Sequence, residues 1–135
     1  MESLNFRIRY DYASSPSGIE VPLTISADTQ RSIGVLAKID TGADFCVFRR
    51  ELADELELRV EEGERKRFST ATGSFETHGH SVTLSCFDYR IESQVFFAID
   101  YEFSRNVLGL QGWLEKFRFG LVHYDRSFFL SHYDQ

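Results

Sequence analysis

The chain has 135 residues, enough to bury one hydrophobic core but short for two, so we predict a single domain spanning residues 1–135. Its formal net charge of −6 gives no positive field to gather phosphates, which disfavours nucleic acid or an anionic membrane as a partner. No stretch approaches the ~20 apolar residues of a bilayer span, no segment marks secretion, and two cysteines are too few for a disulfide framework, so we expect a reduced, cytoplasmic protein without membrane insertion.

The first third of the chain predicts extended strands. In residues 4–10 the apolar side chains alternate with polar ones, the period of a half-buried strand. Residues 19–25 resume an extended pattern, and Pro22 within it predicts an edge strand because proline cannot donate a ladder hydrogen bond. The mostly apolar run Ile33–Ile39 predicts a further strand that delivers Asp40 at its end.

The middle of the chain contains the one convincing helical pattern. Arg49–Glu57 places Leu52 and Leu56 four residues apart, so we predict a helix that covers one side of a sheet. The mixed charges of residues 61–67 predict a solvated turn rather than a binding patch. Strands return from Phe68, and the segments 81–87 and 89–100 predict a long antiparallel hairpin that turns at Asp88.

The last third predicts more short strands. Residues 107–110 form an apolar strand, residues 111–116 a brief helix, and residues 117–123 and 127–131 a hairpin. Trp113 is expected to pack this helix against the sheet. Many short strands beside one or two short helices indicate a mainly β architecture that is either closed or sandwich-like.

Asp40-Thr41-Gly42 carries the chemistry that the sequence offers. Asp40 ends an apolar strand, Gly42 lets backbone approach closely because it lacks a side chain, and Ala43 stays small. This context places a carboxylate in the wall of a cleft. The alternative is that Asp40 merely caps a turn through its side chain.

Three segments, in the same order along the chain, resemble the retroviral-type (retropepsin-like) aspartic proteases. Residues 39–44 are similar to the active-site motif of that family, residues 68–75 stand where the family carries its flap hairpin, and Val107-Leu108-Gly109 is similar to the motif before the C-terminal helix. The resemblance covers residues 20–132. It implies a small closed β-barrel and an aspartic endopeptidase that is active as a homodimer, with Asp40 as the catalytic residue and no metal or organic cofactor.

The resemblance also implies roles for the neighbouring residues. Thr41, Gly42, Ala43 and Gly109 would support the active site, with Thr41 gripping its counterpart in the second subunit. The substrate would be bound by Asp44, Phe45, Val47, Thr70, Ala71, Thr72, Gly73 and Ser74, the last five as the tip of a flap. For Phe45 and Val47 plain core packing is an equal alternative. Viral members carry Arg where this chain has Leu110, so the means of holding Asp44 differs here.

Chemistry gives an independent reason for a dimer. Hydrolysis of an amide by carboxyl groups needs one ionised group to accept a proton from water and one protonated group to polarise the carbonyl. The sequence contains one Asp-Thr-Gly, so the second carboxyl must come from a second copy. Two carboxyls so close cannot both ionise without repulsion, and we therefore expect the dimer to weaken as the pH rises.

Two other interpretations of the whole chain remain open. The chain could be a catalytically silent dimerisation or peptide-binding module of the same fold, or an unrelated β-barrel that binds a ligand.

The histidines and cysteines need a separate interpretation. His78 and His80 share a strand face, but the spacing supplies no complete ligand set, so we predict no metal site. Cys46 lacks a base nearby in sequence and is expected to be an inert buried thiol, although one disulfide with Cys86 stays possible.

Overall fold

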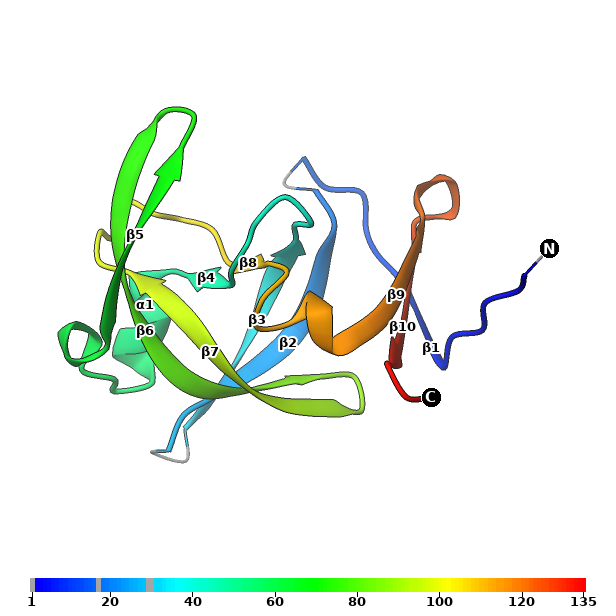
Figure 1. The fold of residues 1–135 in the computed structure, drawn as a ribbon, viewed down its shortest axis with the longest axis horizontal. Helices are drawn as coiled ribbons and strands as arrows, with labels where there is room; N and C mark the ends of the chain where they lie inside the picture. The colour runs from blue at the N-terminus through cyan, green and yellow to red at the C-terminus, as the bar shows by residue number, and fades with distance from the viewer. Residues whose placement is uncertain (1, 17, 29–30) are drawn as a thin grey trace.

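The computed structural model describes residues 2–16, 18–28 and 31–135, which form two β-sheets (Figure 1). The strands are β1 (Ile8–Asp11), β2 (Glu20–Ser26), β3 (Ser32–Ile39), β4 (Val47–Phe48), β5 (Glu64–Thr70), β6 (Gly73–Cys86), β7 (Tyr89–Ala98), β8 (Val107–Leu108), β9 (Phe117–Val122) and β10 (Ser127–His132). The helical segments are α1 (Arg50–Glu55) and the 3-10 turns η1 (Val60–Glu62), η2 (Leu114–Lys116) and η3 (His123–Asp125). The mainly β prediction is confirmed.

The larger sheet closes on itself. Its strand order is β2-β3-β8-β4-β7-β6-β5, and an additional pairing between β2 and β6 turns all of these strands except β5 into a ring. The closure is short, because β2 meets β6 only over Thr24–Ser26. We call this closed sheet the ring sheet. Its closure agrees with the closed architecture that the resemblance implied.

Pro22 lies in the half of β2 that has a single neighbour. β3 accompanies β2 along its whole length, whereas the β6 pairing begins only at Thr24. Proline has no N–H to offer a second strand, so its position matches an edge. The edge prediction therefore holds for the first half of β2 and is wrong for the second half, where the ring closes.

The smaller sheet, with the order β1-β10-β9, lies at the end of the molecule that holds both chain termini (Figure 1). We call it the terminal sheet. The strand predicted from Leu4 starts later than expected, at Ile8, which pairs with Leu130 of β10. Leu4 itself is 73 % exposed, because alternation along one segment cannot supply the partner strand that a ladder needs.

Two predictions in the middle of the chain are corrected in detail. The helix is shorter than predicted, Arg50–Glu55, although Leu52 and Leu56 are both buried as expected. The charged run is not simply a turn, since β5 begins at Glu64. A strand forms there because its solvated side chains find partners across the hairpin, as in the Arg65–Glu76 ion pair at 3.0 Å.

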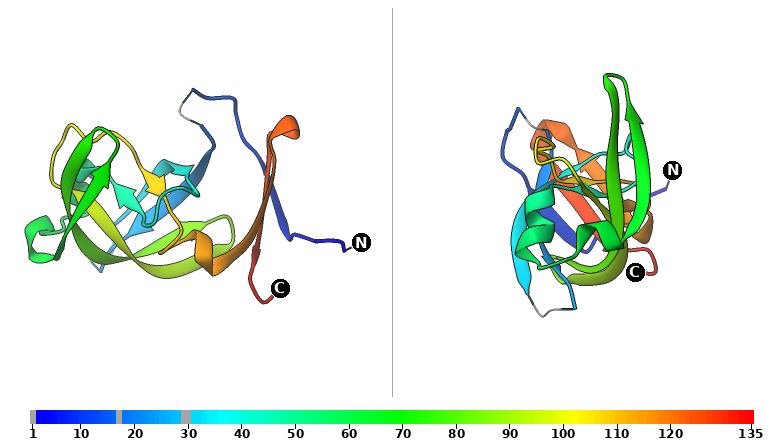
Figure 2. Two further views of the ribbon diagram at one scale, coloured as in Figure 1. Left: turned by 45° about the horizontal axis from the view of Figure 1, so that its top comes forward. Right: turned by 90° about the vertical axis from the view of Figure 1, so that its left-hand side faces the viewer.

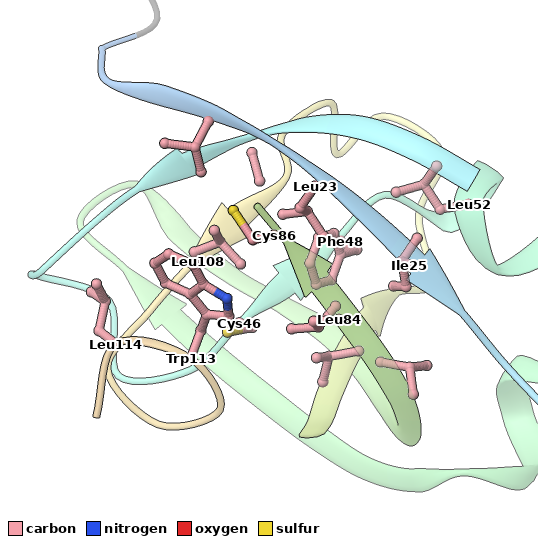
Figure 3. Close-up of a cluster of buried hydrophobic side chains, with 14 of the residues drawn as sticks. Leu23, Ile25, Cys46, Phe48, Leu52, Leu84, Cys86, Leu108, Trp113 and Leu114 are labelled. Carbon is pink, nitrogen blue, oxygen red and sulfur yellow. The ribbon is translucent and has the colours of Figure 1, made fainter. Parts of the chain in front are cut away.

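The hydrophobic core fills the ring sheet and extends to the terminal sheet. Figure 3 shows its side chains converging, with Cys46 beside Trp113. Trp113 is fully buried, and its ring lies 4.9 Å from that of Phe117 and 6.4 Å from that of Phe128, both in the terminal sheet. The predicted packing role of Trp113 is confirmed. No helix among the described residues is long and apolar enough to cross a membrane.

Candidate active site

Asp40 stands directly after β3, where two parallel strands end together. Lys38 and Ile39 pair with Val107 and Leu108 of β8, and the N–H of Asp40 continues this ladder to the carbonyl of Leu108 at 3.0 Å. The structure thus brings the Asp40 motif and the Val107-Leu108-Gly109 motif side by side. The backbone of Asp40 is therefore held in place by hydrogen bonding to the neighbouring strand of the ring sheet.

The Asp40 carboxylate is itself oriented by the turn that follows it. Its Oδ1 accepts the N–H of Gly42 at 2.9 Å, and its backbone carbonyl accepts the N–H of Ala43 at 3.2 Å. Asp40 thus does cap the turn through its side chain, as the alternative interpretation of this residue proposed. The second oxygen, Oδ2, has no hydrogen-bond donor among the described residues and is free to meet a water or a ligand.

Gly109 fits against the Asp40 loop so closely that no side chain could replace it. A Cβ at this position would lie 2.3 Å from the carbonyl oxygen of Phe45 and 2.7 Å from that of Ala43. The next residue, Leu110, donates its N–H to Ala43 at 2.9 Å, and Gln111 donates to the carbonyl of Asp44 at 2.8 Å. These contacts join the two predicted motifs into one rigid unit.

A hollow of about 320 Å³ opens beside Asp40. Of the predicted site residues it brings together Asp40, Gly42, Ala43, Asp44, Phe45, Val47 and Thr70. It is also lined by Phe68, Ser69 and Phe75 of the predicted flap segment and by Val107 of the second motif. Phe103 and Arg105 complete the lining, and the sequence analysis did not identify them. We call this space the aromatic hollow.

Aromatic rings form a continuous wall of the aromatic hollow. The ring centroids of Phe45 and Phe68 are 5.7 Å apart, those of Phe68 and Phe75 5.6 Å, and those of Phe75 and Phe103 5.0 Å. Such spacings are typical of favourable aromatic pairs. Lys66 adds a cation, with its Nζ 4.3 Å from the centroid of Phe45. The wall therefore offers apolar surface to a ligand.

The predicted flap is a β-hairpin that projects beyond the rest of the ring sheet (Figures 1 and 2). Thr70 and Gly73 pair across its turn, and the hydroxyl of Thr70 donates to the carbonyl of Gly73 at 2.9 Å. Gly73 has a φ of +147°, a conformation that side chains rarely adopt. The tip residues Ala71 to Ser74 are exposed and do not line the hollow, whereas Thr70 does.

A family model for aspartyl proteases matches residues 21–111, which include the Asp40 loop, the hairpin and Gly109. The chain belongs to the aspartyl protease family. No curated protein sequence shows a significant match.

Solved structures with the retropepsin-like fold resemble this aspartyl protease family member along most of its length. A retropepsin-like aspartic protease from Rickettsia conorii has 16 % identity and a TM-score of 0.62, over 92 % of this chain and 97 % of that one. The retroviral protease-like domain of Ddi1 from Leishmania major has 19 % identity and a TM-score of 0.61, over 84 % and 88 %. The EIAV protease complexed with the inhibitor HBY-793 has 21 % identity and a TM-score of 0.52, over 80 % and 88 %. At these identities the likeness establishes the fold.

Phe45 and Val47 differ in a way that their spacing did not predict. Val47 is 6 % exposed and pairs with Phe96 of β7, so most of it belongs to the core, whereas Phe45 is half-buried and forms part of the aromatic wall. Asp44 and Thr41 are exposed on the loop. Within the described ranges, Asp44 has no ion-pair partner, consistent with Leu110 standing where viral family members carry Arg.

His78, His80 and the two cysteines do not line the aromatic hollow. His78 and His80 bond the backbone carbonyls of Gly63 and Val60 at 3.0 and 2.9 Å. His78 is buried and His80 is half-buried. Cys46 and Cys86 are free and buried, and burial raises the pKa of each thiol to about 12. Cys46 is buried as predicted, and its lack of reactivity stays a prediction.

Proposed function

We propose that the chain is one subunit of a homodimeric aspartic endopeptidase, in which Asp40 and its counterpart in a second copy hydrolyse an internal peptide bond. The observation that carries the proposal is the Asp40 carboxylate, held by the Gly42 N–H on one oxygen and open on the other, beside the aromatic hollow. One carboxylate would remove a proton from water, and the other, protonated, would polarise the scissile carbonyl and then protonate the leaving nitrogen.

The free edge of the terminal sheet supports assembly with a second copy. β9 is six residues long, has no strand beyond it in the described structure, and exposes Phe119, Leu121 and Val122 by 37, 47 and 43 %. An apolar edge of this length favours pairing with another chain. β9 also follows soon after Leu110 and Gln111, which bond the Asp40 loop, so pairing along β9 would fix the two Asp40 loops relative to each other.

The aromatic hollow supports an extended peptide with a large apolar side chain as substrate. Phe45, Phe68 and Phe103 would enclose such a side chain, and the hairpin could close over the backbone. Enclosure would exclude water from the reacting bond, which strengthens the electrostatic action of the carboxylates.

A peptide-binding module without turnover is the second candidate. The observation that favours it is Asp44, whose carboxylate no cation holds in the described part of the chain because Leu110 stands beside it. A loosely held Asp44 would bind a peptide backbone less firmly, which leaves room for binding without efficient chemistry.

Digestion of a peptide library between pH 4 and 8 separates the two candidates. We compare the wild type with Asp40→Asn, whose amide oxygen can still accept the Gly42 N–H, so the loop keeps its turn. We expect cleavage by the wild type and a loss of about 10³-fold or more in the variant, the upper range of general acid–base catalysis. Equal cleavage by both proteins would refute the assignment of Asp40, and binding of peptides without any cleavage would favour the module.

A further inference from the structure

A second hollow, of about 330 Å³, lies next to the aromatic hollow, and the two share Arg105 in their walls. Lys38, Arg49 and Asn106 also line it. We call this space the basic hollow. Because Arg105 borders both spaces, a ligand that fills the aromatic hollow would pass within reach of the basic one.

The cations of the basic hollow are not neutralised by the protein. In the described part of the chain neither Lys38, Arg49 nor Arg105 forms an ion pair, although the chain as a whole has a net charge of −6. The Nε atom of Arg49 is buried and lacks a hydrogen-bond partner there.

Among the described residues, Glu20 is the one carboxylate that lines the basic hollow. It stands opposite Lys38 on the neighbouring strand and accepts the Ser15 hydroxyl at 3.3 Å. Its single negative charge leaves the lining with an excess of positive charge, so the hollow would attract an anion.

Asn106 gives the basic hollow a fixed frame. Its backbone carbonyl accepts the N–H of Lys38 at 2.8 Å, and its side-chain oxygen accepts the N–H of Arg49 at 3.1 Å. Its amide nitrogen donates to the carbonyl of Leu36 at 3.4 Å. Asn106 thus joins the backbones of β3 and of the segment that begins at Arg49, from which two of the cationic side chains arise.

The position of Lys38 relates the basic hollow to the reacting carboxylate. Lys38 precedes Asp40 by two residues, a separation of about 7 Å along an extended backbone. An extended peptide rises by a similar amount over two residues. A side chain that enters the basic hollow would therefore lie within about two residues of the scissile bond.

We infer that the basic hollow binds the carboxylate of an acidic side chain in the peptide substrate, close to the scissile bond. This inference rests on the proposed function. A guanidinium binds a carboxylate in a paired, directional way, which makes Arg105 the main contact and Lys38 a supporting charge. The substrate would then combine a large apolar residue with an Asp or Glu nearby.

Matched peptides test the inference without turnover. Starting from a sequence that the wild type binds, Glu and Gln are compared at each position within three residues of the scissile bond, with Asp40→Asn as the uncleaving receptor and fluorescence anisotropy as the readout. We expect about tenfold tighter binding of Glu at one position, the value of a modest charged hydrogen bond. The preference should fall to near unity in Arg105→Gln, weaken in Lys38→Gln and weaken in concentrated salt.

The controls separate this inference from its rivals. Arg90→Gln removes a cation of β7, beside the turn at Asp88, and should leave the preference unchanged. Amidated and free C-terminal carboxyls distinguish a side chain from a chain terminus, and competition by inorganic phosphate alone would show a general anion site instead. Equal binding of Glu and Gln everywhere, or a preference that survives Arg105→Gln, would overturn the inference while cleavage and the proposed function stand. Failure of every peptide to bind would overturn both.

Discussion

The two sheets of this molecule differ in how much backbone they leave unpaired at their edges. The ring sheet closes through the β2–β6 pairing and carries Asp40, whereas the terminal sheet has two edge strands, β1 and β9, each paired on one side only. Of these, β1 is four residues long and bears the Arg9–Asp11 ion pair, but β9 is longer and apolar. Charge and shortness protect an edge from association. If the proposed dimer forms through β9, holding the carboxylate and recruiting a second copy are tasks of separate regions.

Trp113 connects these regions, and its removal should have the largest effect. We expect Trp113→Ala to lower the free energy of unfolding by about 3–5 kcal/mol, because a fully buried aromatic leaves a cavity. Urea denaturation measures the loss. Trp113→Phe, which keeps a ring against Phe117 and Phe128, should cost clearly less. A loss below 1 kcal/mol in the alanine variant would show that the two sheets are not joined here.

The closure of the ring sheet should be visible in the chemistry of Cys46. With a pKa of about 12, its thiol has little thiolate at pH 8, so iodoacetamide should alkylate it about a thousandfold more slowly than a free cysteine. Mass spectrometry of labelled protein measures the rate, and the chain in concentrated urea is the control. Rapid labelling of the folded protein would mean that the ring sheet opens.

A charge on β9 should break assembly while leaving the subunit folded. Leu121→Lys places a cation on the exposed edge of each copy, and we expect the dissociation constant of the dimer to rise about thirtyfold, the effect of losing one central contact. Leu36→Lys, an equal change at an exposed leucine of the ring sheet, is the matched control. Sedimentation velocity distinguishes them, and equal behaviour of both variants would remove β9 as the contact.

The smallest effect is expected at the hairpin. A hydrogen bond from Arg65 holds the pKa of Glu76 below its usual value, so the stabilisation is complete above the unfolded pKa and is lost as the pH falls through the folded pKa. Lowering the pH from 6 to 3 should therefore reduce the protection factors of the hairpin amides, corrected for the intrinsic pH dependence of exchange, about threefold more in the wild type than in Glu76→Gln, as for an exposed ion pair. Identical pH profiles would contradict it.

Local patterns predicted the frame of the site and part of its wall, such as Phe45 and Thr70, but not the part formed by Phe103 and Arg105. Asp40 and Gly109 could be found because each motif is continuous in sequence. Arg105 and Phe103 precede the second motif by a few residues, and their place beside Asp40 depends on the parallel pairing of β3 with β8, which no spacing within one segment encodes. The charged run of β5 was misread for the same reason, since Glu76 on another strand makes it extended.

One long strand has a consequence for motion. β6 begins in the hairpin, where residues 73–76 pair with β5 alone, gains β7 at Thr77, and reaches β2 at Thr83. Its first residues can open without disturbing the ring sheet, whereas its last cannot. We therefore expect protection against hydrogen exchange to rise along β6 from Gly73 to Ser85. Amides at the start of the strand should exchange through local fraying, and amides at its end only through global unfolding.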